Sequence, residues 1–177
     1  MAPLKILVVD DEKDICDLLN RILSRPPECL VDCAQSAEIA ERKLDADPYA
    51  LVLSDYKLEE GKTGLDVLYH AKSRHPNIIT ILMTGYGSDN IATRAVAEGV
   101  YDYLLKPFRS ILEVKNAVDR GLRYYTLLTK YNEKLADASL QKELLEETLE
   151  KARRTREILR ALVQKIHKVD DSAPPEV

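Results

Sequence analysis

The sequence predicts an α/β fold in which a doubly wound, five-stranded parallel sheet precedes a long C-terminal α-helical coiled-coil extension. Two observations support this prediction. Short apolar runs alternate with amphipathic segments of helical length over residues 4–120, a pattern typical of a parallel sheet with covering helices. Residues 122–173 contain neither glycine nor proline and are rich in leucine, glutamate, lysine, arginine and alanine, which favours one uninterrupted helix.

Five runs rich in valine, isoleucine, leucine and tyrosine have the composition of strands that are buried on both faces of a sheet. The second run, CLVDCA, is the least clear of them. The predicted strands are residues 4–9, 29–34, 50–54, 78–83 and 101–105.

The segments between these strands carry the start and stop signals of helices. Ser36 and Ser88 are typical N-terminal caps, Pro26 and Pro27 stop the first helix, and Gly99 closes the fourth. The predicted helices are residues 13–24, 36–46, 64–74 and 88–98, with a fifth that begins after Pro107 and extends from about residue 110 to 168.

The composition excludes several classes of protein. The chain has 177 residues, of which 45% are hydrophobic, so it is long enough for one domain and an appendage and is not disordered throughout. No apolar run approaches the roughly 18 residues of a membrane span, and the N-terminus lacks a signal sequence, so we expect a cytoplasmic protein without membrane contact. The net charge of −4 argues against broad nucleic-acid affinity, and the three cysteines lack metal spacing, which favours reduced thiols.

Polar residues close the predicted strands at points that a parallel sheet brings to one edge. Asp10 and Asp11 close the first run, Asp55 the third, Thr84 the fourth and Lys106 the fifth. Because ligands of such sheets bind beyond the carboxyl ends of the strands, these side chains are predicted to form one small site. Three carboxylates so close together repel one another unless a divalent cation and the lysine offset their charge. A carboxylate beside a hard cation and an ammonium is a candidate acceptor of a phosphoryl group.

Four segments that carry these residues, KILVVDDE, LVLSDYKL, ILMTGYG and YDYLLKPF, resemble the CheY-like receiver domain of bacterial two-component response regulators. The resemblance covers residues 4 to about 120 and includes the five hallmark positions in the family's order. It implies a flavodoxin/CheY-like sheet. It also implies a Mg²⁺-dependent phosphorelay reaction in which Asp55 attacks the phosphorus of a sensor histidine kinase, a phosphotransfer protein or a small acyl phosphate and becomes an aspartyl phosphate.

The resemblance also implies roles for the residues around Asp55. Asp10, Asp11 and Asp55 are expected to hold Mg²⁺, with the backbone carbonyl of Lys57 as a further ligand. A capping role for Asp11 at the first helix is compatible with this.

The remaining hallmark residues are expected to bind and sense the phosphoryl group. Lys106 is expected to contact one phosphoryl oxygen, and the peptide bond between it and Pro107 is expected to be cis. Thr84 is expected to donate its hydroxyl to another phosphoryl oxygen, and Tyr103 to change rotamer with the loop that Thr84 moves. Asp55, Thr84 and Lys106 are therefore the expected catalytic group, and Thr84 and Tyr103 the expected switch.

Two features depart from the family's usual pattern. The loop after Asp55 has Glu59 where many receivers carry proline, and it is one residue longer before Gly64. Lys57 and Tyr86 occupy the positions at which the family tunes the lifetime of the aspartyl phosphate. A bulky Tyr86 is expected to shield the phosphoryl group from water.

The predicted C-terminal helix has a heptad pattern. Every d position of the heptads from Ala117 to Ile166 is apolar. The a positions of the same heptads include two basic residues, Lys142 and Arg156. A monomeric helix would leave this stripe in water, so we expect a coiled coil that makes the chain a homodimer. Acidic residues dominate residues 143–150 and basic residues the segment that follows, which favours antiparallel pairing. Receivers joined through this helix are usually parallel, and the orientation stays open.

These observations divide the chain into three expected parts: a receiver domain (1–122), a helical arm continuous with helix five (123–168) and a disordered tail (169–177). The leading hypothesis is a response regulator that signals to an unknown target through protein–protein contacts. We expect no enzymatic activity apart from its own phosphoryl transfer and autodephosphorylation.

Two alternatives concern the output of the chain. The stretch VDRGLRYYTLLTKYNEKL resembles the linker of longer regulators, so the chain could be the receiver and linker part of an AAA+ transcription activator or an HD-GYP phosphodiesterase. Direct DNA binding through basic residues 151–160 is disfavoured, because that stretch continues the apolar stripe and has no asparagine-rich base-reading pattern. We therefore expect no nucleic-acid partner.

Overall fold

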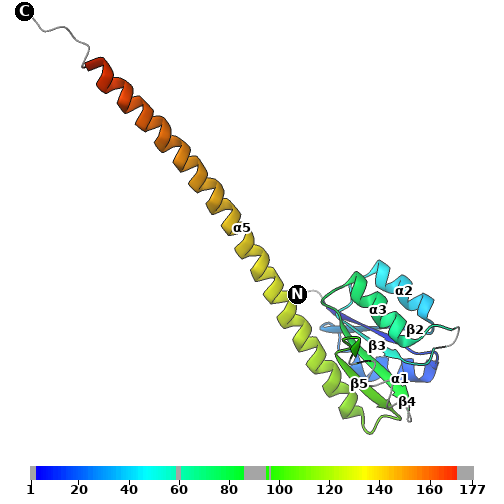
Figure 1. Cartoon of the computed structure of the whole chain (residues 1–177). Coiled ribbons are helices and arrows are strands. Elements are labelled where there is room, and N and C mark those ends of the chain that lie inside the picture. The colour runs from blue at the N-terminus through cyan, green and yellow to red at the C-terminus, as the bar shows by residue number, and fades with distance from the viewer. Residues whose placement is uncertain (1–2, 59–60, 86–94, 96, 171–177) are drawn as a thin grey trace, which may run out of the picture. The chain divides into compact units, whose positions relative to one another are not determined.

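The computed structural model describes residues 3–58, 61–85, 95 and 97–170, except for the side chains of residues 158, 159 and 161–170. The chain forms two compact units, Met1–Thr129 and Lys130–Val177. The first unit holds the sheet and the helices that cover it (Figure 1). Within the described part of the chain, no helix combines the length and hydropathy that crossing a membrane requires.

A five-stranded parallel sheet forms the centre of the first unit, as predicted. Its strand order is β2-β1-β3-β4-β5, so the chain crosses over at β1 and winds in both directions. β4 continues beyond its predicted end because Thr84 and Gly85 pair with Leu105 and Lys106 of β5. The strands are β1 (Leu4–Val9), β2 (Cys29–Ala34), β3 (Leu51–Asp55), β4 (Ile79–Gly85) and β5 (Asp102–Lys106).

Four helices of the predicted five are described, and their bounds agree closely with the sequence signals. Ser36 caps the second of them, because its side chain accepts a hydrogen bond from the N–H of Ile39 at 3.3 Å. The helix predicted over residues 88–98 lies largely outside the described residues. The helices are α1 (Lys13–Leu23), α2 (Ala37–Ala46), α3 (Gly64–Arg74) and α5 (Ile111–Asp170).

The hydrophobic core consists of two clusters, one on each face of the sheet. Successive residues of β1 alternate between them: Ile6 and Val8 contribute to the cluster beneath α1 and the first part of α5, and Leu7 and Val9 to the cluster beneath α2 and α3. All four are fully buried, and burying each such side chain contributes roughly 1.5–3 kcal/mol. Burial on both faces explains why the strands are continuous apolar runs, and it leaves the strand ends as the place for polar groups.

The start of α3 packs directly against the end of β3. The N–H of Gly64 donates to the carbonyl oxygen of Tyr56 at 2.9 Å. A Cβ atom at Gly64 would overlap the main-chain carbonyl of Asp55 and lie 2.8 Å from Oγ of Ser54. Glycine therefore allows the helix to approach the strand, and this close packing fixes the main chain that carries Asp55.

We predict that Gly64→Ala lowers the free energy of unfolding by about 1–3 kcal/mol, because the added methyl group meets main-chain atoms that cannot rotate away. Urea denaturation of the full chain measures the change. Gly85→Ala is the matched control: a Cβ atom there meets nothing within 4 Å, so its effect should stay below about 0.5 kcal/mol. Equal stability of Gly64→Ala and the unmodified protein would contradict this packing.

Candidate functional site

Lys106, at the end of β5, lies at the centre of the polar edge of the sheet. Its Nζ is 2.7 Å from Oδ2 of Asp10 and 3.0 Å from Oδ1 of Asp55. The lysine side chain is only 15% exposed, and it reaches past β4 to carboxylates at the ends of β1 and β3. One ammonium is therefore shared by two acidic groups that are far apart in the sequence.

Asp10 is fully buried, and its two oxygens differ in their contacts. Oδ1 accepts a hydrogen bond from the N–H of Glu12 at 3.1 Å. Oδ2 forms the ion pair with Lys106 but has no hydrogen-bond partner of good geometry among the described residues. Burial raises the pKa of the Asp10 carboxyl above its ordinary value, and the nearby Lys106 offsets only part of this effect.

The charge of Lys106 is stabilised by its two partners. Burial lowers the pKa of its ammonium, but the contacts with Asp10 and Asp55 have the larger combined effect, so the pKa is raised above its ordinary value. The lysine is therefore a fixed positive charge at neutral pH. With two carboxylates facing it, the cluster carries an excess of negative charge when all three groups are ionised.

Asp55 is held by a contact at each oxygen. Oδ1 lies beside Lys106, and Oδ2 accepts a hydrogen bond from the main-chain N–H of Lys57 at 3.0 Å. The residue is 7% exposed, so its carboxylate is oriented but remains accessible from the edge of the sheet. This is a suitable arrangement for a nucleophilic carboxylate.

The structure also places the other predicted site residues. Thr84 is buried at the end of β4, next to β5. The ring of Tyr103 on β5 is 43% exposed, and Asp11 is partly buried at the same edge as Asp10. The peptide bond between Lys106 and Pro107 is cis, as the family resemblance predicted.

Two sequence-based predictions fall on Glu59 and Tyr86, which lie outside the described residues.

The capping role considered for Asp11 is not observed. The N-cap residue of α1 is Glu12, and no side chain forms a capping hydrogen bond there.

The chemistry of the cluster fits a hard divalent cation. Asp10 and Asp55 supply carboxylate oxygens, the ligand type that Mg²⁺ prefers. The buried Oδ2 of Asp10 lacks a hydrogen-bond partner among the described residues, so a cation there would satisfy it. In the described part of the chain, no group of three or more histidine, cysteine or acidic side chains is arranged to hold a metal.

Several residues beside the site were not singled out by the sequence. Oε1 of Glu12 lies 3.8 Å from Nζ of Lys106, at the mouth of the cluster. An open cavity of about 670 Å³ adjoins Asp55 and Lys106, and its walls are largely apolar. Two sequence signals could have pointed to these residues. Glu12 directly follows the paired aspartates, and Phe108, the single phenylalanine of the chain, directly follows Pro107. The apolar residues of this wall are Ile15, Leu18, Phe108 and Ile111.

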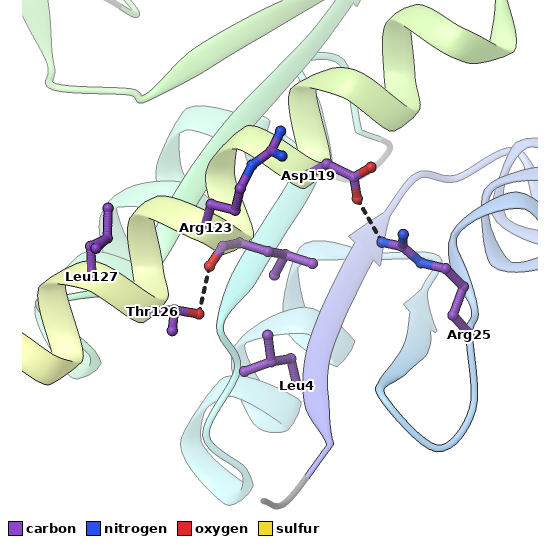
Figure 2. A pocket seen from close by; sticks show the side chains of 7 residues that line it. Leu4, Arg25, Asp119, Arg123, Thr126 and Leu127 are labelled. Carbon is purple, nitrogen blue, oxygen red and sulfur yellow. Dashed lines mark hydrogen bonds and ion pairs between the residues drawn. The ribbon is translucent and has the colours of Figure 1, made fainter.

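A second cavity lies away from this cluster, between the start of β1 and α5. Figure 2 shows Leu4 of β1 opposite the helix that carries Asp119, Arg123, Thr126 and Leu127. Three of its polar residues form hydrogen bonds: Arg25 donates to Oδ1 of Asp119 at 2.6 Å, and the Thr126 hydroxyl donates to the main-chain carbonyl of Leu122 at 2.9 Å. No group here resembles the acidic cluster at the opposite ends of the strands.

We predict that Asp10→Asn raises the free energy of unfolding at neutral pH, by roughly 1 kcal/mol. The variant keeps an oxygen for the N–H of Glu12 and leaves one carboxylate, Asp55, for one ammonium. The pKa of Asp10 is raised from 3.8, so ionising this carboxyl lowers the free energy of unfolding. This destabilisation is absent below pH 3.8 and reaches its full size once the pH exceeds the raised pKa. The gain should therefore shrink on acidification.

Urea denaturation in EDTA, repeated over a pH series, tests this prediction. The control is Asp47→Asn, which removes an exposed carboxylate from a 3.1 Å pair with Lys5 and should change stability by less than about 1 kcal/mol. Destabilisation by Asp10→Asn at neutral pH would contradict the proposed charge imbalance.

Known proteins resemble the first unit of this chain. The family model described as the response regulator receiver domain matches residues 6–119. The response regulator protein PilR of Pseudomonas aeruginosa is 36% identical over 107 residues, which cover 60% of this chain and 24% of PilR. The crystal structure of a response regulator receiver domain protein from Clostridium thermocellum has a TM-score of 0.64 and 28% identity, over 71% of this chain and 98% of that one.

The DNA-binding transcriptional regulator NtrC of Escherichia coli is 34% identical over 120 residues, which cover 68% of this chain and 25% of NtrC. NtrC is described as DNA-binding, which does not agree well with our expectation that this chain has no nucleic-acid partner. The chain spans about a quarter of the length of these curated relatives. Since the family model covers more than half of the chain, the resemblance inferred from the sequence is confirmed: the protein belongs to the family of response regulator receiver domains.

Proposed function

We propose that this protein is a response regulator that accepts a phosphoryl group on Asp55 from a sensor histidine kinase or a phosphotransfer protein. The main support is the Lys106 ammonium, which contacts both Asp10 and Asp55 in a nearly buried setting. A charge so placed can neutralise an incoming phosphoryl oxygen without having to be assembled during the reaction.

The reaction begins with attack of an Asp55 carboxylate oxygen on the phosphorus of the donor. The bond from phosphorus to the donor breaks, and an acyl phosphate forms on Asp55. The N–H of Lys57 holds Oδ2 of Asp55 in place, and Lys106 exchanges its carboxylate contact for a phosphoryl oxygen. The chain is the substrate of its kinase and catalyses only its own phosphorylation and dephosphorylation.

Mg²⁺ is the expected cofactor of this phosphoryl transfer. Its expected ligands are the carboxylates of Asp10, Asp11 and Asp55 and the main-chain carbonyl of Lys57. When bound, the cation supplies positive charge to the phosphoryl oxygens and offsets the excess negative charge of the cluster. The phosphorylated Asp55 side chain carries a charge of about −2 in place of −1, so Lys106 alone cannot balance the product.

Phosphorylation is proposed to act through the end of β4 and the neighbouring strand. Thr84 donates its hydroxyl to a phosphoryl oxygen, and the end of β4 shifts with it. The ring of Tyr103, 43% exposed on β5, then has a different surface to pack against. The result is a shift between two conformations that a cytoplasmic protein target distinguishes.

The helical arm is proposed to join two copies of the chain. In its described part the apolar stripe is open to solvent: Tyr131, Leu135, Leu145 and Leu149 are 62%, 49%, 60% and 51% exposed. Burial against a second helix would stabilise the pair by roughly 1.5–3 kcal/mol for each such side chain that becomes fully buried. That stabilisation outweighs the cost of placing the charged residues Lys142 and Arg156 at a positions of the heptad.

We predict that acetyl phosphate and Mg²⁺ add one phosphoryl group to the full chain and that Asp55→Asn abolishes the addition. Mass spectrometry of the intact protein measures it. Asp47→Asn, which changes an exposed carboxylate, should be labelled like the unmodified protein, and EDTA should prevent labelling. Label that persists in Asp55→Asn or in EDTA would show that the acceptor or the role of the metal is misassigned.

We predict that Leu145→Glu shifts the full chain from dimer towards monomer, because it places a carboxylate in the buried seam of the coiled coil. Sedimentation at several micromolar concentrations gives the dissociation constant, which should rise at least tenfold. Leu144→Glu makes the same change one residue away, outside the stripe, on a side chain that is 64% exposed, and should leave dimerisation intact. Equal effects of the two variants would refute the proposed seam.

A further inference from the structure

Two thiols meet beneath the phosphoacceptor edge of the sheet. Cys16 lies near the start of α1 and Cys33 lies in β2, and the two thiols are close enough to affect each other's pKa. Sγ of Cys33 is also 3.5 Å from the main-chain carbonyl oxygen of Cys16. The crossover from β1 through α1 to β2 brings the two sulfurs together, and neither thiol takes part in the proposed phosphoryl transfer.

The two thiols differ in accessibility. Cys16 is 2% exposed and belongs to the core, whereas Cys33 is only partly buried and borders solvent. Cys29, the third cysteine, is buried at the first position of the same strand. It lies roughly 13 Å from Cys33 along β2 at about 3.3 Å per residue. It therefore provides a control within the same protein.

The surroundings also give the two sulfurs different chemistry. Interaction with the Cys16 thiol lowers the pKa of Cys33, while burial and the carboxylates of Asp17 and Asp32 oppose this and Lys43 supports it. An accessible thiol with thiolate character beside a buried second thiol is the arrangement of an oxidisable cysteine and its resolving partner.

We propose that Cys16 and Cys33 are a modification site, at which a peroxide converts the two thiols into a reversible intramolecular disulfide. The Cys33 thiol loses its proton, and the thiolate attacks one peroxide oxygen. The O–O bond breaks, the departing hydroxide takes up a proton to become water, and Cys33 becomes a sulfenic acid. The Cys16 sulfur then attacks the Cys33 sulfur, the S–O bond breaks, and the Cys16 proton leaves with the hydroxyl as water. Two thiols are oxidised by two electrons, and one hydrogen peroxide is reduced to two waters.

Oxidation alters a contact with the phosphoacceptor edge. In the reduced protein the Cys16 thiol donates to the main-chain carbonyl oxygen of Asp10 at 3.5 Å. The disulfide has no proton to donate, so this hydrogen bond is lost where β1 leads into α1. The bond also ties α1 covalently to β2.

The reduced full chain, treated with hydrogen peroxide at low protein concentration and then alkylated, tests the proposal. Peptide mass spectrometry should find Cys16 joined to Cys33 and Cys29 still free, and dithiothreitol should restore all three thiols. This readout does not involve phosphorylation, so it stands or fails separately from the proposed function. Three free thiols after treatment, or a disulfide that contains Cys29, would overturn the proposal.

Single variants separate the two roles. Cys29→Ser should form the same disulfide as the unmodified protein. Cys16→Ala should stop at the Cys33 sulfenic acid, which dimedone traps, and Cys33→Ser should leave Cys16 reduced because it is buried. Disulfide formation between two chains instead of within one, seen on a non-reducing gel, would also count against the proposal. The experiment on the unmodified chain decides the matter even if a variant folds poorly.

Discussion

The structure of the site depends on one ammonium that two buried carboxylates share. Lys106 contacts Asp10 and Asp55 at 2.7 and 3.0 Å, while Asp10 is fully buried. Burial makes an isolated charge costly, so the ionised form of the Asp10 carboxylate depends on the lysine beside it. The cluster still has one negative charge too many when all three groups are ionised. That imbalance makes the edge of the sheet receptive to a cation.

The sequence predicted most of the fold because its signals are local and mutually consistent. Strands buried on both faces must be apolar throughout, so the polar residue that ends each run marks the strand end and also the site. The end of β4 could not be predicted, because Thr84 and Gly85 are added by pairing with β5. Side-chain geometry escaped prediction for a similar reason: the approach of Glu12 to Lys106 at 3.8 Å and the exposure of Tyr103 depend on packing between distant segments.

The charges of the arm have a local explanation that the sequence pattern concealed. Acidic and basic blocks suggested pairing between antiparallel chains, but within the described part of the helix Lys151 pairs with Glu147 at 2.7 Å and Arg154 with Glu150 at 3.4 Å. Such pairs, four residues apart, contribute about 0.3–0.5 kcal/mol each to a single helix. The charge blocks therefore no longer favour one orientation, and the apolar stripe remains the main reason to expect a second chain.

Helix α1 connects the features that surround Asp55. Its outer side contributes Ile15 and Leu18 to the apolar wall beside Asp55, and its inner side contributes Leu19 to the core. Between them, Cys16 contacts both the main chain of Asp10 and the thiol of Cys33. A rigid helix cannot adjust one of these faces without moving the others. The proposed change in the bonding of Cys16 would therefore reach the wall of the site and Asp10, which begins the acidic cluster.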